Sequence, residues 1–190
     1  MSRPPVLDET HLTAEQRAVF DDIRSGPRGL VEGPLRVWLQ SPVLAERAQK
    51  LGAFCRYETR LSPRLSELAI VIVGAHWRSS FEWSVHAPIA AKAGIDSAVL
   101  EAIRIGARPS VIRPDERAVY RFSHELLETK RVSEDAYEDV INLVGTEGAV
   151  ELVGILGYYT LICMTINAFE VPVANGALEP FQFSENAERQ

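Results

Sequence analysis

The sequence predicts an all-α, single-domain protein, a helical bundle preceded by an N-terminal helical arm. Helix-start signals recur along the chain: a serine followed by proline at Ser41 and again at Ser62 places proline at the first helical position, where its missing N–H has no cost. The apolar–polar alternation typical of strands is rare. The 190 residues, 46% of them apolar and 24% charged, are enough for one sizeable core.

The predicted helices follow one another with short connections. The first begins at a capping box of Thr13 and Gln16 and runs to about Ile23, and a turn-rich loop then leads to Pro34. Gly94 stops a helix, and the Arg78–Ser80 stretch predicts a break. The remaining predicted helices span residues 42–57, 63–77, 81–93, 97–105, 114–128, 134–144 and 149–169. We therefore divide the chain into an arm (1–34), a helical domain (35–172) and an irregular tail (173–190).

Charge and composition exclude several classes of protein. A formal charge of −6 and no basic run argue against binding to nucleic acid or to a charged membrane surface. The apolar stretch 152–166 predicts a buried or interface helix rather than a membrane span, because Glu147, Glu151 and Asn167 bracket it closely. The N-terminus lacks the apolar segment of a secretory signal, so we expect a cytoplasmic protein.

The two cysteines carry no recognisable motif. Cys55 and Cys163 lie more than a hundred residues apart in apolar helical surroundings, with no Cys-x-x-Cys and no zinc ligand set. The expected state is two inert buried thiols, with a long-range redox pair as the alternative.

The candidate site begins with Glu82 and His86. Four residues apart, they share one face of a predicted helix, and Trp83 stands beside the carboxylate. The segment around them is largely apolar. Burial there is expected to raise the pKa of the carboxyl group and to lower that of the imidazole, which brings both towards neutrality.

Several motifs, taken in order, resemble the carboxymuconolactone decarboxylase family, in the superfamily that also holds the alkyl hydroperoxidase D proteins. They are Leu61-Ser-Pro-Arg-Leu-Ser-Glu67, Glu82-Trp83-x-x-His86-x-x-x-Ala90 and Gly94-Ile95, with weaker likeness at Ser41-Pro42, Val132-Ser133 and from Glu151 to Asn167. The resemblance covers residues 35–172. It implies an alkyl hydroperoxidase D-like helical fold and a homo-oligomer, a trimer or a hexamer.

The peroxidase branch of that superfamily has a glutamate 19 positions before the histidine and a Cys-x-x-Cys just ahead of it. Glu67 and His86 keep that separation, but Ser79 and Glu82 stand where the two thiols belong. Peroxide reduction there needs a thiolate and a resolving thiol, so the peroxidase hypothesis loses its mechanism here.

The decarboxylase branch implies acid–base chemistry on a small organic acid or lactone, with no metal or redox cofactor. We predict Glu67, Glu82 and His86 as the catalytic set, with His86 as general acid or base, Glu82 as its partner or second base, and Glu67 as a relay. Trp83, Ser79 and His76 are the candidate substrate-contacting residues.

Other interpretations stay open. Glu67 is also placed to pair with Arg64 or Arg60, and Trp83 to serve only in helix packing. Tyr158 and Tyr159 are core residues by default, with a phenol donor to the site as the alternative. A divalent metal held by Glu67, Glu82 and His86, and a non-catalytic oligomeric binding protein, are the remaining alternatives.

Overall fold

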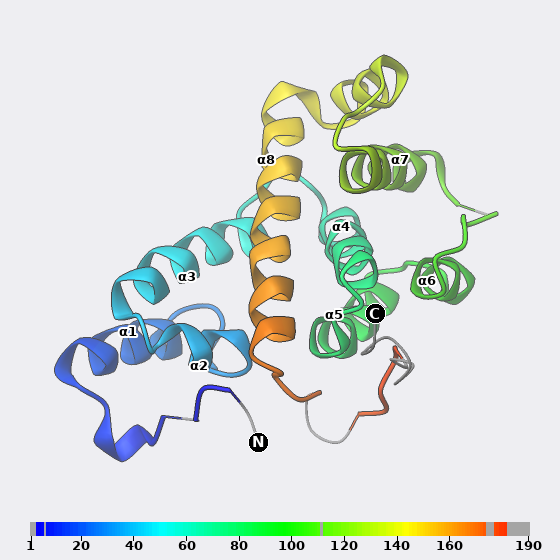
Figure 1. The fold of residues 1–190 in the computed structure, drawn as a ribbon. Coiled ribbons are helices and arrows are strands. Elements are labelled where there is room, and N and C mark those ends of the chain that lie inside the picture. Colours follow the sequence, from blue (N-terminus) through cyan, green and yellow to red (C-terminus); the bar gives the residue numbers. More distant parts are fainter. Residues whose placement is uncertain (1–2, 6, 111, 174–176, 182–190) are drawn as a thin grey trace.

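The computed structural model describes residues 3–5, 7–110, 112–173 and 177–181, and within them helices joined by loops are the regular elements, with no strand (Figure 1). This confirms the all-α prediction. A 3-10 turn, Glu9–His11, precedes the helices. The helices are α1 (Ala14–Ser25), α2 (Pro34–Trp38), α3 (Pro42–Tyr57), α4 (Pro63–His76), α5 (Ser80–Lys92), α6 (Ser97–Arg104), α7 (Pro114–Thr129) and α8 (Glu134–Ala168).

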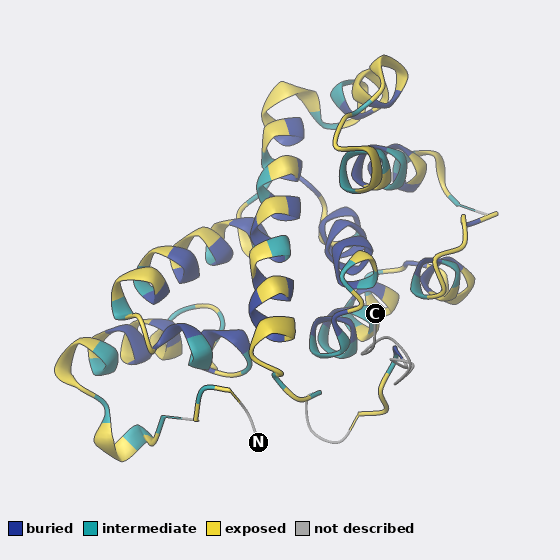
Figure 2. Ribbon diagram, in the orientation of Figure 1, coloured by how far each residue is buried: buried dark blue, intermediate teal, exposed yellow. Residues whose placement is uncertain are grey.

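The long helix α8 forms the middle of the molecule. Figure 1 shows α1, α2 and α3 on one side of it and α4 to α7 on the other, and α8 packs against α2, α3, α4, α5 and α7. Helix α4 is the most enclosed element, since every residue from Leu65 to Gly74 is buried. The buried sides of the helices face α8 and α4, and their exposed sides face outward (Figure 2). The core therefore lies along α4 and α8, and the predicted catalytic residues lie beside it.

Helix α8 combines two segments that the sequence predicts as separate helices. Gly145 lies inside it with φ 73° and ψ 177°, which is not helical, so the chain kinks where the prediction placed a gap. By length and composition α8 is apolar enough to cross a membrane, but 56% of its most apolar window is buried inside the fold. That burial is typical of the core helix of a helical bundle.

Two parts of the chain differ from the prediction or escape it. The five-residue helix α2 was not predicted, because the sequence marks a loop up to Pro34 and its next helix only at Pro42. It follows Gly33, whose φ of 54° and lack of a capping side chain hide the start signal. The predicted irregular tail lies mostly outside the described residues, although residues 177–181 form no helix or strand.

Candidate functional site

The α4–α5 hairpin builds the site. After α4 the chain reverses through Arg78, which takes a left-handed conformation with φ 48°, and α5 returns against α4. This turn brings Glu67 on α4 opposite Glu82 and His86, which lie one helical turn apart on α5. The structure thus brings together the three residues predicted as the catalytic set.

His86 bridges the two carboxylates. Its Nδ1 lies 2.7 Å from Glu67 Oε2 and its Nε2 lies 3.0 Å from Glu82 Oε1. All three side chains are buried, with 4%, 8% and 5% of the His86, Glu67 and Glu82 side chains exposed. Ionised carboxylates only accept hydrogen bonds, so this geometry suits an imidazole that carries a proton on each ring nitrogen and is therefore a cation.

The pKa of His86 corrects the expectation from the sequence. Burial lowers the pKa, as expected, but the attraction of Glu82 and the hydrogen bonds to Glu67 and Glu82 outweigh it and raise the pKa from 6.5 to about 9. The predicted shift towards neutrality was therefore wrong for the imidazole. Its two acceptors, rather than its burial, decide its protonation.

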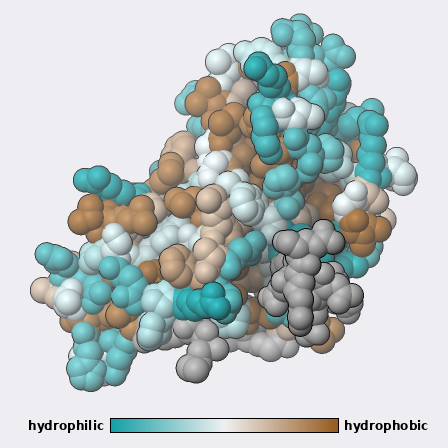
Figure 3. Space-filling model, viewed as in Figure 1, coloured by the Kyte–Doolittle hydropathy of each residue, from teal (hydrophilic) through white to brown (hydrophobic). Residues whose placement is uncertain are grey.

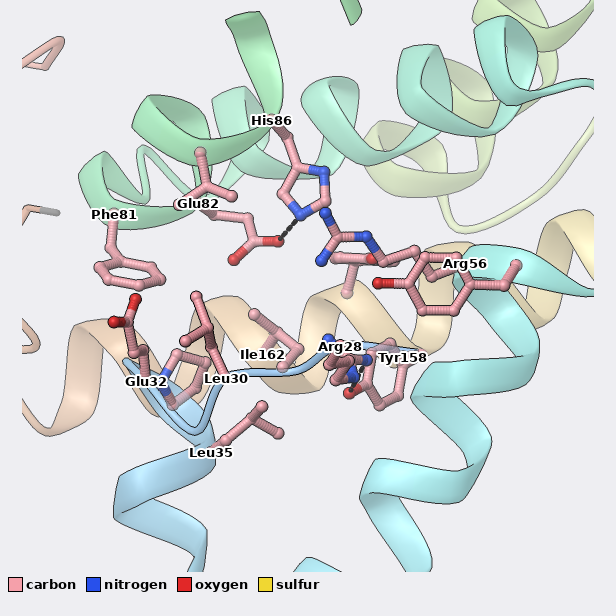
Figure 4. Close-up of a pocket in the computed structure, with 14 residues that line it drawn as sticks. Arg28, Leu30, Glu32, Leu35, Arg56, Phe81, Glu82, His86, Tyr158 and Ile162 are labelled. Atoms are coloured by element: carbon pink, nitrogen blue, oxygen red, sulfur yellow. Dashed lines mark hydrogen bonds and ion pairs between the residues drawn. The ribbon is translucent and has the colours of Figure 1, made fainter. Parts of the chain in front are cut away.

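A cavity of about 250 Å³ opens on this group (Figure 4). Glu82 and His86 line it, whereas Glu67 lies behind His86 and does not. A volume of this size suits a small molecule rather than a polymer segment. The cavity is lined by Arg28, Leu30, Glu32, Pro34, Leu35, Arg56, Tyr57, Phe81, Glu82, Val85, His86, Tyr158, Tyr159 and Ile162.

The alternative partners of Glu67 are engaged elsewhere. Arg64 forms ion pairs with Asp115 and Glu116 on α7, and Arg60 pairs with Glu147 on α8. Glu67 is therefore bound to His86 and is not part of an arginine pair.

The three predicted substrate-contacting residues lie outside this cavity. Trp83 packs edge-on against Phe181, with ring centroids 5.6 Å apart. The Ser79 hydroxyl is fully buried beside the Cys163 thiol. His76, at the end of α4, bonds to Glu128 through its Nδ1 at 2.8 Å, in a separate cavity. The expectation that these residues contact a substrate at the Glu82–His86 site is not met by the geometry.

The sequence prediction missed the two arginines of the cavity. Arg56 projects from α3, and Arg28 reaches in from the loop between α1 and α2, where its Nη2 donates to the Tyr158 hydroxyl at 3.2 Å. No local pattern marks Arg28, because the contact spans 130 residues of chain. Tyr158 and Tyr159 were left open between core packing and a role at the site; they are buried and also line the cavity.

Both cysteines are buried free thiols. Burial raises the pKa of Cys55 to about 11 and that of Cys163 well above its usual range. Neither residue lines the cavity. Since the thiolate is the reactive form, both thiols are poor nucleophiles at neutral pH.

The geometry does not favour a metal at this site. The two carboxylates bind opposite nitrogens of one imidazole, so the three side chains share no common coordination point. Among the residues that the structure describes, no group of three or more His, Cys, Asp or Glu side chains is arranged to hold a metal ion.

No protein-family model matches the chain, and no curated protein matches it either. Solved structures do match. The peroxidase-related protein of Ralstonia eutropha JMP134, described as an alkylhydroperoxidase AhpD core, is 16% identical with a TM-score of 0.74 and covers 92% of this chain and 93% of its own. A cysteine-to-alanine variant of the debrominase Bmp8, in complex with 2,3,4-tribromopyrrole, is 14% identical with a TM-score of 0.71, covering 95% and 96%.

A third solved structure is similar over a shorter part of this chain. It is a protein of unknown function from Agrobacterium tumefaciens, described as a putative antioxidant defence protein AhpD; it is 14% identical with a TM-score of 0.64 and covers 75% of this chain and 98% of its own. At these identities the likeness shows the fold. The chain has an AhpD-like helical fold, which confirms that part of the resemblance, while the decarboxylase branch stays a prediction.

Proposed function

We propose that this protein is a cofactor-free acid–base enzyme of the decarboxylase or lyase type, acting on a small organic acid or lactone. The observation that carries the proposal is the buried row Glu67–His86–Glu82, whose outer member and imidazole line a small cavity. A buried row of ionisable groups lowers stability unless each group is paired. Here each group is paired, and only the Glu82 end of the row is open to a ligand in the cavity.

The geometry refines the roles within the row. His86 holds a proton between the two carboxylates, Glu67 fixes the ring from behind, and Glu82 faces the cavity beside His86. We therefore assign Glu82 as the group that exchanges a proton with the substrate, and His86 as the proton donor that reprotonates Glu82. Glu67 is a positioning residue, because it lies behind His86 and not in the cavity.

A decarboxylation at this site balances without another reactant. The bond between the substrate carboxylate and its neighbouring carbon breaks, carbon dioxide leaves, and the bonding electron pair remains on that carbon. Glu82, protonated by His86, then delivers a proton to the carbon, and solvent returns a proton to His86. General acid–base steps of this kind contribute roughly 100- to 10,000-fold to the rate.

A peroxidase activity is the second candidate, because two of the similar structures are described as peroxidase-related or antioxidant proteins. It requires reactive thiols, and the only two cysteines of the chain are buried with raised pKa values. A non-catalytic binding protein is the third candidate. It gives no reason for a buried histidine that bonds to two carboxylates.

A homo-oligomer, a trimer or a hexamer, remains part of the proposal. Exposed apolar side chains occur on the outward faces of α3 and α8, and Figure 3 shows apolar groups at several places over these helices. They are Val43, Leu44, Leu51 and Phe54 on α3, and Val150, Val153, Leu161 and Met164 on α8. Light scattering after gel filtration tests this expectation, and a monomer at working concentration would contradict it.

The experiment that tests the proposed function is a turnover screen in D2O. Small β-keto acids and carboxylated lactones are offered to the enzyme, and carbon dioxide release and deuterium incorporation at carbon are followed by gas analysis and NMR. We expect Glu82→Gln and His86→Gln to lose roughly 100-fold or more of any activity found. His76→Gln, which breaks a histidine–glutamate pair in another cavity, is the matched control and keeps full activity.

A double Cys55→Ser, Cys163→Ser variant separates the two enzymatic candidates. The acid–base account expects it to retain activity towards the organic acid or lactone. Peroxide consumption by the wild type that disappears in this variant, together with turnover that survives Glu82→Gln, would replace the acid–base account with the peroxidase one.

A further inference from the structure

Hydrogen-bond donors line the cavity around the Glu82–His86 group. Figure 4 shows Glu82 and His86 on one side, Arg28 and Tyr158 on the other, and Arg56 entering from α3. Tyr159 also lines the cavity, beside His86, and its ring packs edge-on against the imidazole with centroids 5.3 Å apart. We call Arg28, Arg56 and Tyr159 the donor wall.

Two donor atoms of the donor wall lack a hydrogen-bond acceptor. Within the described part of the chain, the buried Tyr159 hydroxyl and the buried Nε of Arg28 have no hydrogen-bond partner. Arg28 and Arg56 are half-buried, and neither forms an ion pair with a described carboxylate. An unpaired buried donor costs free energy, and an arginine is always charged, so the wall is suited to an acceptor that arrives with a ligand.

One carboxylate of the cavity, that of Glu32, is set apart from this wall. Glu32 also lines the cavity, but it is exposed, and Figure 4 places it beside Phe81, away from Arg28 and Arg56. The positive side of the cavity is therefore not neutralised by the protein's own Glu32.

Gly52 on α3 shows that the fold keeps space for this wall. A Cβ atom there would lie 2.0 Å from the Tyr158 hydroxyl oxygen and 2.4 Å from Arg28 Nη2. Glycine within a helix costs about 1 kcal/mol relative to alanine, and here it leaves room for the Arg28–Tyr158 contact. Arg28 itself belongs to residues 1–34, outside the part of the chain that carries the family resemblance.

We infer that the donor wall is an oxyanion site, which binds the substrate oxygen that becomes negatively charged as carbon dioxide leaves. The inference rests on the proposed function for the identity of that oxygen. When the bond to the carboxylate breaks, its electron pair forms a new C=C bond, and the π electrons of the adjacent C=O move onto oxygen to give an enolate. The enolate then collapses as its carbon takes the proton from Glu82. The substrate class is thus one with a ketone or lactone carbonyl next to the reacting carbon.

The arrangement supplies the charge stabilisation that a cofactor-free reaction needs. Preorganised donors aimed at a developing oxyanion act strongly in a partly dry cavity, and removing one typically costs a factor of roughly 100 to 1,000 in rate. Arg28 and Arg56 supply positive charge, and the Tyr159 hydroxyl supplies an uncharged hydrogen-bond donor. Arg28 stands across the cavity from Glu82 and His86, so that its charge and the proton for carbon meet the substrate from different sides.

The experiment is an equilibrium titration with 4-nitrophenol, which needs no turnover. Its phenolate mimics an enolate oxygen, and its two protonation states absorb at different wavelengths near neutral pH. We expect the wild type to bind the phenolate at least about tenfold more tightly than 4-nitroanisole, its uncharged methyl ether, and to lower the pKa of the bound phenol. Arg28→Gln, Arg56→Gln and Tyr159→Phe are each expected to weaken phenolate binding about tenfold.

Matched controls keep the result interpretable. Arg24→Gln on α1, the helix before the Arg28 loop, and Arg47→Gln on α3, the helix of Arg56, remove exposed arginines and are expected to leave phenolate binding unchanged. Circular dichroism of each variant reports whether it folds. Wild-type protein that binds no phenolate, that prefers the neutral ether, or that binds equally well in the wall variants and the controls overturns the inference.

Failure of the proposed function is distinguishable from failure of the oxyanion site. Glu82→Gln is expected to retain phenolate binding, since it removes a negative charge from the cavity. Phenolate binding that depends on the wall, combined with turnover that is indifferent to Glu82, leaves the site standing and removes the acid–base mechanism.

Discussion

The charge of His86 makes the stability of the protein depend on pH in a direction that can be measured. The folded state raises the pKa of this imidazole from 6.5 to about 9 through Glu82 and Glu67. Because the folded pKa is the higher one, the cation's contribution to stability is complete below pH 6.5 and is lost as the pH rises through about 9. At about 1.4 kcal/mol per pH unit, that interval corresponds to about 3 kcal/mol.

The perturbation is His86→Gln, and the assay is urea unfolding at pH 6.0, 7.5 and 9.5. Wild-type protein is expected to lose up to about 3 kcal/mol of unfolding free energy across this range relative to the variant, whose amide does not titrate. His124→Gln, which removes an exposed histidine stacked on Tyr120, is the control and should follow the wild type. Equal pH dependence in His86→Gln and wild type would refute the assignment of a cation held between two carboxylates.

Three further predictions concern the backbone, an ion pair and the thiols. Gly145→Ala should destabilise the protein by about 1–3 kcal/mol in urea unfolding, because the φ and ψ of Gly145 suit only glycine. The control is Gly157→Ala, in a regular part of α8 with open space around it, which should be neutral or stabilising by up to about 1 kcal/mol. Glu116→Gln should lower the free energy of unfolding by about 2–4 kcal/mol, because it removes the charge of a carboxylate that is only 3% exposed and is paired with Arg64. An unchanged unfolding midpoint would contradict this. Cys163 should resist alkylation in the folded protein at pH 7.5 and react only after unfolding, as mass spectrometry can show.

Local signals were sufficient to predict most of the helices. Proline after serine marks the starts of α3 and α4, and the capping box at Thr13 marks α1, because these residues act within one helical turn. The i, i+4 spacing of Glu82 and His86 likewise determines that both lie on one face of α5. The helix α2 was missed because it has five residues and a glycine cap without a side chain.

The protonation of the site and its far wall could not be predicted in the same way. The sign of the His86 shift depends on two carboxylates bonding the same ring, and this follows from how α4 packs on α5. Arg28 joins the cavity only because the loop after α1 folds back to α8, where Tyr158 meets it. Trp83 and His76 were predicted to contact the substrate because they lie near Glu82 and His86 in sequence. Their positions on α5 and α4 instead direct each of them into another cavity.

The central claim is that His86 rests as a cation between Glu67 and Glu82, ready to supply a proton. The measurement that tests it most directly is a pH titration of the His86 ring nitrogens by 15N NMR in protein labelled at histidine. We predict two protonated ring nitrogens at pH 7.5 and titration near pH 9. A ring that is neutral at pH 7.5, with titration at or below pH 6.5, would contradict the claim.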